Sequence, residues 1–186
     1  MNISNKPRLI GIAGSFASGK DTIAHHLVED FGFSHVSTSD MVREVALKER
    51  GSIERPVLYE VATEHRRREG AGVFVKYALN KPLPLVVTGM RSMGEAKAIK
   101  AAGGVMLFVD APAELRYERM KSRLRDREAF LSLDEFIINE QKEWHTGDGD
   151  ADFNLRDIKA TADIVIENDL DLTAFLNAAY RALHLK

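Results

Sequence analysis

The 186-residue sequence contains no cysteine, and this absence excludes several kinds of site. Without a thiol there is no disulfide framework, no cysteine nucleophile and no zinc–thiolate centre. Long apolar runs are missing as well, because no stretch approaches the roughly 20 residues that a membrane-spanning helix requires. The N-terminal segment also lacks the apolar core of a signal peptide. We therefore expect a cytoplasmic protein with no membrane partner.

An excess of charge of either sign is also missing. The 26 basic and 28 acidic residues give a net charge of -2, so no overall basic field favours nucleic acid, and we expect no nucleic-acid partner. The apolar content of 45% is typical of a globular protein, and the chain is long enough for one domain with a substantial core. We expect a single domain over residues 1–186, and the sequence leaves the oligomeric state unknown.

The most informative motif is Gly-x4-Gly-Lys over residues 14–20. It follows the apolar run 9–13 and precedes a segment with apolar residues at helical spacing, so its context is strand, glycine loop and helix, as in a phosphate-binding P-loop. In such a loop, backbone N–H groups and the helix N-terminus surround phosphate oxygens, and the lysine adds a positive charge. The predicted nucleotide-binding residues are Gly14, Ser15, Phe16, Ala17, Ser18, Gly19, Lys20, Asp21 and Thr22.

The two residues after Lys20 depart from the usual motif. Asp21 stands where Ser or Thr is common, and the hydroxyl comes one residue later, at Thr22. A hydroxyl at this place normally ligates Mg²⁺. We therefore predict that Asp21 and Thr22 hold the metal, although the carboxylate of Asp21 also brings negative charge toward the phosphates.

The apolar pattern predicts an alternation of strands and helices. Strands are expected at 8–13, 35–37, 85–88, 105–109 and 163–167, and helices at 20–31, 40–50, 57–69, 73–79, 93–102, 112–123, 133–144 and 170–183. Ser39 is a plausible N-cap for the second helix, and 146–161 is expected to be irregular. Short apolar strands separated by helices imply a parallel sheet covered on both faces, with ligands at the carboxyl ends of the strands. Those ends carry the P-loop, residues 37–43 and 88–91, Asp110 and Asn168.

The segment Ser37-Thr-Ser-Asp-Met-Val-Arg43 resembles the Ser-Thr-Gly-Asp-Met-Leu-Arg segment of adenylate kinases. The resemblance implies that Thr38 lies beside the base of a nucleotide acceptor and that Arg43 binds its phosphate, which a guanidinium can hold with two hydrogen bonds. The alternative is that Asp40 caps a helix and Arg43 lies on its solvated face.

The turn Thr88-Gly-Met-Arg91-Ser92 is similar to the Asp-Gly-Phe-Pro-Arg turn of adenylate kinases. It is closer to the Asp-Gly-Ile-Arg-Ser turn of an archaeal family of nucleotide-kinase-like proteins. Both resemblances imply that Arg91 binds the acceptor phosphate; otherwise it is an ordinary loop arginine. Thr88 replaces the Asp of both families, so the carboxylate that orders the Mg²⁺-bound water is missing, and Asp21 or Asp40 is a candidate replacement.

The densest basic stretch contains Arg116, Arg119, Arg123, Arg125 and Arg127. It resembles the arginine-bearing lid of nucleoside monophosphate kinases, with Arg119, Arg123 and Arg125 at the closest positions. The resemblance implies that these three stabilise the transferring phosphoryl group. Acidic residues are interleaved, so a solvated, salt-bridged helix is the alternative. The run Arg66-Arg67-Arg68 is predicted to lie on a solvated face, with the alternative that it also faces the acceptor.

Two features are similar to dephospho-CoA kinases. Asp40 resembles their strand-two Asp, which could accept a hydroxyl proton from the acceptor, although the Asp40-x-x-Arg43 spacing is that of adenylate kinases. Gln141 and the segment 162–168 resemble the C-terminal part of the same enzymes. This resemblance implies that Asn168 lies beside the adenine of the donor.

Together the resemblances imply a three-layer α/β/α P-loop NTPase fold with a five-stranded parallel sheet in the order two-three-one-four-five. They also imply an acceptor-binding insert at about 38–80 and a small arginine-bearing lid at about 119–160. The expected activity is ATP- and Mg²⁺-dependent phosphoryl transfer to a small nucleotide, foremost a nucleoside or deoxynucleoside monophosphate; phage deoxynucleotide kinases share a sequence similar to 19–22. Dephospho-CoA kinase is the alternative enzyme, and a nucleotide-binding switch or slow ATPase the alternative outside that class. The expected catalytic residues are Lys20, Asp40, Arg119, Arg123 and Arg125.

Overall fold

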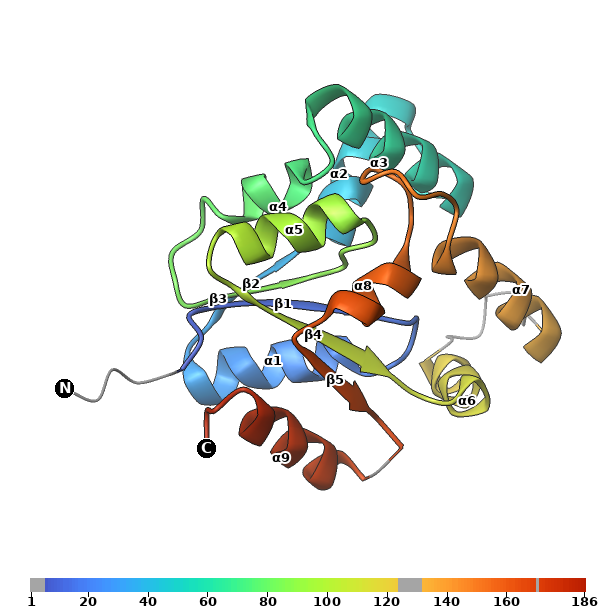
Figure 1. The fold of residues 1–186 in the computed structure, drawn as a ribbon. Coiled ribbons are helices and arrows are strands. Elements are labelled where there is room, and N and C mark those ends of the chain that lie inside the picture. Colours follow the sequence, from blue (N-terminus) through green and yellow to red (C-terminus); the bar gives the residue numbers. More distant parts are fainter. Residues whose placement is uncertain (1–5, 124–131, 170) are drawn as a thin grey trace.

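Five parallel strands form the centre of the structure (Figure 1). They are β1 (Leu9–Gly14), β2 (Ser34–Ser37), β3 (Leu85–Thr88), β4 (Val105–Asp110) and β5 (Ile164–Glu167). This computed structural model describes residues 6–123, 132–169 and 171–186. The strands lie in the order β2-β3-β1-β4-β5, and every neighbouring pair is parallel. The predicted sheet, its order and its direction are therefore confirmed.

Helices cover both faces of the sheet. On one face, α1 (Lys20–Phe31) and α9 (Leu172–Ala182) bury Ile23, Leu27 and Phe175 against Ile10 and Ile12 of β1. On the other face, α5 (Met93–Ala101) and α8 (Leu155–Thr161) pack against the strands. The continuous apolar sequences of β1 and β3 follow from this arrangement, because a central parallel strand is buried on both sides. The result is the predicted three-layer fold.

Two further groups of helices lie in the connections that lead out of β2 and β4 (Figure 1). Between β2 and β3 lie α2 (Thr38–Arg50), α3 (Arg55–Glu69) and α4 (Val73–Ala78). Between β4 and α8 lie α6 (Ala113–Arg123) and α7 (Leu133–Trp144). Because all five strands are parallel, the loops that follow them meet at one edge of the sheet. In Figure 1 this edge faces α6 and α7, and the candidate site lies there.

Two local expectations are wrong. The segment 146–161 is not irregular throughout, since its end forms α8, whose residues Leu155 and Ile158 are buried in the core. The C-terminal end of the range proposed for the lid therefore packs against the sheet. The second error concerns α2, which begins at Thr38 with Ser37 as its N-cap; the Ser37 side chain accepts a hydrogen bond from the backbone N–H of Asp40.

Within the described residues, no helix combines the length and the apolar character needed to cross a membrane.

Candidate functional site

The loop between β1 and α1 has a backbone conformation that turns its N–H groups inward. Gly14, Ala17 and Gly19 all have positive φ, at 154°, 59° and 100°. A Cβ atom on Gly14 would lie 2.2 Å from the carbonyl oxygen of Val109, so only glycine fits there. In the described part of the chain, nothing accepts a hydrogen bond from the N–H groups of Ala17, Gly19 or Asp21, and Gly19 caps α1 without a side-chain bond. These N–H groups are therefore available to phosphate oxygens.

Lys20 begins α1, and its side chain is largely buried beneath the loop. The residue is 8% exposed, and its ammonium nitrogen lies 3.4 Å from a carboxylate oxygen of Asp21, which itself points mostly into solvent. The carboxylate of Asp21 and the hydroxyl of Thr22 are hard oxygen donors in the first turn of α1. No cluster of three or more His, Asp or Glu residues suited to a metal occurs among the described residues. Two oxygen donors beside a phosphate loop fit Mg²⁺, which commonly uses one or two protein ligands together with substrate phosphates.

Asp110 supports the P-loop from the end of β4, a role that the sequence did not reveal. One carboxylate oxygen accepts hydrogen bonds from the Ser15 hydroxyl and the Ala111 N–H, both at 2.9 Å. The other oxygen lies 2.6 Å from the ammonium nitrogen of Lys159, on α8. Asp110 thus holds the loop in shape through partners on three elements. Since Lys159 already neutralises it, Asp110 is a poor replacement for the carboxylate missing at Thr88.

Asn168, which follows β5, ties the P-loop to α6. Its side-chain nitrogen donates to the carbonyl oxygen of Ser18 at 2.8 Å. Arg119 donates to the backbone and side-chain oxygens of Asn168, at 3.0 and 3.2 Å. The structure therefore brings Asn168 and Arg119, two predicted site residues, together at the P-loop. The proximity of Asn168 to the adenine stays a prediction.

Arg116 anchors the helices α6 and α7 to the P-loop. It is 5% exposed and forms a two-pronged ion pair with Glu140 of α7. Two further N–H bonds, on Nε and Nη1, reach the carbonyl oxygens of Ala111, at 2.7 Å, and of Phe16, at 3.4 Å. All three guanidinium nitrogens are thus used inside the protein. The side chain of Arg123 and the whole of Arg125 and Arg127 lie outside the described residues, so their assignment to a lid stays a prediction.

A cavity of about 600 Å³ lies beside the P-loop, between α2, α3, the loop after β3 and the segment 146–153. Phe16 of the P-loop forms part of its wall, so the phosphate loop and the cavity are contiguous. Apolar and aromatic side chains supply much of the surface, including Val42, Leu58, Tyr59 and Phe153. Among the described lining residues there are four arginines, at positions 43, 55, 66 and 91, and no carboxylate. The cavity is therefore suited to an anionic ligand with an apolar body.

Only some of the residues predicted to bind the acceptor line the cavity. Arg43 and Arg91 both line the cavity, although they come from different elements. Asp40 lies in the first turn of α2, where it forms an exposed ion pair with Arg43 at 2.7 Å. Thr38 is 1% exposed and does not line the cavity, so the structure separates it from the other predicted acceptor ligands.

The prediction of a solvated arginine run is wrong for Arg66, whereas Arg67 and Arg68 are exposed. Arg66 is 2% exposed, and one of its terminal nitrogens lies 3.1 Å from both carboxylate oxygens of Glu95, which is fully buried. Glu95 also accepts the backbone N–H groups of Arg91 and Ser92, as part of the capping box of α5. The Ser-x-x-Glu spacing of that capping box is readable in the sequence. The arginine that pairs with Glu95 lies on another helix and cannot be read from this spacing.

Thr88, at the position where the sequence resemblance led us to look for Asp, is buried and bonded to a neighbouring strand. Its hydroxyl lies 2.9 Å from the Nε2 atom of His35 on β2. Partial burial lowers the pKa of His35, while the carboxylates of Asp21 and Asp40 oppose this shift. Both carboxylates therefore lie close enough to His35 to interact with it electrostatically.

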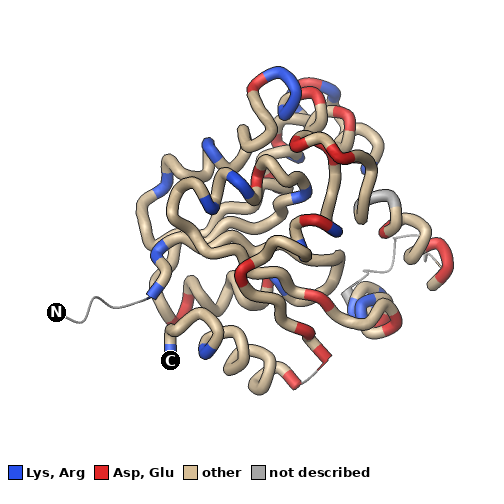
Figure 2. The backbone as a smooth tube through the Cα atoms, in the orientation of Figure 1, with Lys and Arg blue, Asp and Glu red and all other residues tan. Residues whose placement is uncertain are grey.

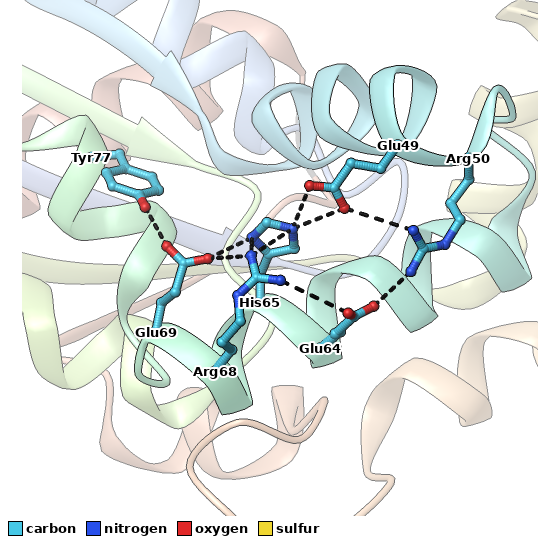
Figure 3. Close-up of polar contacts among 7 residues, drawn as sticks. All are labelled: Glu49, Arg50, Glu64, His65, Arg68, Glu69 and Tyr77. Atoms are coloured by element: carbon cyan, nitrogen blue, oxygen red, sulfur yellow. Dashed lines mark hydrogen bonds and ion pairs between the residues drawn. The ribbon is translucent and has the colours of Figure 1, made fainter.

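A polar network holds together the helices α2, α3 and α4, of which α2 and α3 line the cavity (Figure 3). His65 of α3 contacts Glu49 of α2 at 3.2 Å and Glu69 at 2.9 Å. Glu69 in turn accepts hydrogen bonds from the Tyr77 hydroxyl on α4 and from Arg68. These bonds, led by that of Tyr77, lower the pKa of the Glu69 carboxyl to about 2. The network therefore links α2, α3 and α4 through residues that are not among those lining the cavity.

The sequence model of the AAA domain family matches residues 10–143, from β1 almost to the end of α7. The chain belongs to this family. The match covers the P-loop and every arginine of the cavity, so the family region of this AAA domain protein contains the candidate site. Among curated proteins, no sequence matches this one.

Solved structures similar to this AAA domain protein include TT1252 and several kinases. TT1252 from Thermus thermophilus is 22% identical, with a TM-score of 0.60 and 97% of each chain covered. A shikimate kinase from Bacteroides thetaiotaomicron is 12% identical, with a TM-score of 0.61, over 95% of this chain and 98% of that one. A gluconokinase from Sinorhizobium meliloti is 14% identical, with a TM-score of 0.54, over 96% and 93%. At such identities the likeness shows the fold. Family and fold together therefore show an AAA domain protein with the fold of these structures.

Proposed function

We propose that this AAA domain protein is an ATP-dependent kinase that transfers the γ-phosphoryl group to a small nucleotide, foremost a nucleoside or deoxynucleoside monophosphate. The observation that carries the proposal is the contiguity of two sites through Phe16, which belongs to the P-loop and also lines the arginine-bearing cavity. A donor held by the loop and an acceptor held in the cavity would meet there. Such positioning is the main contribution that a protein makes to phosphoryl transfer.

The chemistry of the cavity favours a nucleotide over a polyhydroxylated acid. A polyol needs hydrogen-bond acceptors for its hydroxyl groups. The described lining residues offer no carboxylate, and their neutral acceptors are limited to the side chains of Ser39, Tyr59, Asn139 and Thr146. A nucleoside monophosphate instead presents a flat, weakly polar base and a phosphate. The aromatic wall of Tyr59 and Phe153, whose ring centroids are 4.9 Å apart, suits the base, and the arginines suit the phosphate.

Most of the predicted residues, with Thr38 as an exception, have a role in this proposal. Lys20 and the inward N–H groups of residues 15–22 hold the triphosphate, and Asn168 lies at the donor end. Asp21 and Thr22 would hold Mg²⁺, which neutralises charge on the phosphates when bound. Arg43 and Arg91 bind the acceptor phosphate. Arg119, Arg123 and Arg125 are proposed to stabilise the transferring group.

Dephospho-CoA kinase is the second candidate, and Asp40 is the observation that favours it. The carboxylate lies at the carboxyl end of β2, beside Arg43 at 2.7 Å, where it could take the proton of an acceptor hydroxyl. An ionised phosphate acceptor needs no such base. Asp40→Asn therefore separates the two candidates, because it should abolish transfer to an alcohol and leave most of the transfer to a phosphate.

A coupled assay of ADP release tests the proposal directly. The panel contains AMP, CMP, UMP, GMP, the deoxynucleoside monophosphates and dephospho-CoA, each with Mg²⁺ and ATP. We expect ADP release that requires one of the monophosphates. Turnover with dephospho-CoA alone would favour the second candidate, and ADP release that no acceptor accelerates would indicate a switch or a slow ATPase instead.

A further inference from the structure

Arg66 carries unused hydrogen-bonding capacity inside the cavity wall. A guanidinium has five N–H bonds, one on Nε and two on each terminal nitrogen. In Arg66 only Nη2 is bonded, to Glu95, and neither Nε nor Nη1 has an acceptor in the part of the chain that the structure describes. The residue is 2% exposed and lines the cavity. Three buried N–H bonds of a charged group therefore lack a partner.

The surroundings of Arg66 do not compensate for this deficit. Its guanidinium carbon lies 5.7 Å from the ring centre of Phe74 and 5.1 Å from that of Phe153. Aromatic faces attract a cation but do not replace hydrogen-bond acceptors, and a buried donor left without one is destabilising. Arg66 is thus held in an arrangement that costs stability unless something else supplies oxygen atoms.

Arg116 provides a comparison within the same chain. It is also almost fully buried and also pairs with a glutamate, but its Nε, Nη1 and Nη2 atoms all have protein acceptors. Arg116 therefore shows the hydrogen bonding expected of an arginine whose role is to join elements of the fold. Arg66 has the ion pair that orients it, yet keeps its other donors unbonded.

Glu95 determines where those donors lie. The carboxylate is fully buried and pairs with Arg66 while it accepts the N–H groups of Arg91 and Ser92. It therefore fixes Arg66 relative to the loop that carries Arg91, which also lines the cavity. Such prior orientation lowers the entropy lost when a ligand binds.

We propose that Arg66 binds an oxyanion of the acceptor, and that Glu95 is the residue that positions it. The ligand chemistry is a carboxylate or phosphoryl oxygen, since both accept charge-assisted hydrogen bonds from a guanidinium. The identification of the ligand as the acceptor rests on the proposed function, whereas the anion site itself does not. Arg66 then determines specificity, because a neutral acceptor would leave its donors unbonded.

A titration observed by NMR tests the anion site without any turnover. The ¹H–¹⁵N signal of the Arg66 Nε–H group is followed in a Lys20→Met background, which weakens phosphate binding at the P-loop. Inorganic phosphate, acetate and, as a neutral control, glycerol are added in separate series. We expect a saturable shift with at least one anion and none with glycerol. No shift with either anion would overturn the proposal.

The two anions also show whether the oxyanion that Arg66 binds belongs to a phosphate or to a carboxylate. A response to phosphate indicates a phosphate monoester, whereas a response to acetate alone supports the anion site but contradicts a monophosphate acceptor. Failure of the acceptor panel with a clear Arg66 response would contradict the proposed function and leave the anion site standing.

A kinetic comparison tests the role in specificity. Arg66→Lys keeps the charge beside Glu95 but removes the remaining guanidinium donors. We expect it to raise the acceptor KM at least tenfold while the ATP KM changes less than twofold. Arg67→Lys, one residue along the same helix and exposed, is the matched control and should change neither. An unchanged acceptor KM in a folded Arg66→Lys protein would overturn the proposal, and the NMR titration decides the matter if that variant does not fold.

Discussion

Gly19→Ala should damage the nucleotide site and the stability of the fold together. Gly19 has a φ of 100°, and a Cβ atom there would lie 2.3 Å from the side-chain nitrogen of Asn168. That nitrogen donates the buried 2.8 Å hydrogen bond to Ser18. Left-handed backbone in a residue with a side chain costs about 1–2 kcal/mol. A buried donor or acceptor left without its partner costs about 1–3 kcal/mol more.

Gly32→Ala is the matched control for the backbone term alone. Gly32 ends α1 with a φ of 69°, and a Cβ atom there would meet no atom within 4 Å. Gly32→Ala should therefore lower the free energy of unfolding by only about 1–2 kcal/mol. For a chain of this length each kcal/mol lowers Tm by about 2–4 °C. We thus expect a loss of roughly 2–8 °C for Gly32→Ala and of roughly 4–20 °C for Gly19→Ala.

Calorimetry with ATP and thermal unfolding check this comparison. Gly19→Ala should weaken ATP binding more than tenfold, whereas Gly32→Ala should leave it unchanged, because only the first displaces Asn168 from the P-loop. In an Asn168→Ala background the extra cost of Gly19→Ala should shrink, since the clashing atom is gone. Equal losses of Tm in the two single variants, or full ATP affinity in Gly19→Ala, would refute the reasoning.

The remaining predictions concern the P-loop, the acceptor arginines and the network of Figure 3. Ala17→Gly should raise Tm, because Ala17 has a φ of 59° and glycine relieves about 1 kcal/mol of backbone strain; a lower Tm would argue against strain there. Arg43→Ala should raise the acceptor KM far more than the ATP KM in steady-state assays. A larger increase of the ATP KM would instead place Arg43 at the donor site. Tyr77→Phe removes the main cause of the low pKa of Glu69, so an NMR titration should show that pKa rising from about 2 toward 4.5. Because the folded-state pKa of Glu69 lies below its unfolded value, its stabilising effect is present above about pH 4.5 and is lost toward pH 2. The stability difference between wild type and Tyr77→Phe should therefore narrow over that range of pH, and a constant difference would contradict the assignment.

The parts of the fold that the sequence predicted are those specified by neighbouring residues. Continuous apolar runs gave the strands, and the glycine spacing of residues 14–20 gave the P-loop. Local ambiguity explains the errors at helix ends, because either Ser37 or Ser39 is an acceptable N-cap. The seven residues of α8 are too few to show helical periodicity, and their helix depends on burial of Leu155 and Ile158.

The different environments of Arg66, Arg67 and Arg68 could not be predicted fully from neighbouring residues. Three consecutive residues of a helix point in three directions about 100° apart, so Arg66, Arg67 and Arg68 could not share one environment. Ala62, one turn before Arg66, shares its face and indicates that this position turns inward. Even so, the burial of Arg66 depends on Glu95, 29 residues away on another helix. Both basic and acidic residues are spread over the backbone trace (Figure 2).

The central claim is that the main-chain N–H groups of residues 15–22, together with Lys20, bind a nucleoside triphosphate. Titration calorimetry of ATP with Mg²⁺ into wild type and Lys20→Ala tests it most directly, with circular dichroism to verify that the variant is folded. We predict one site per chain in the wild type and a loss of affinity of at least a hundredfold in Lys20→Ala. Absence of binding to the wild type, or equal affinity in the two proteins, would contradict the claim.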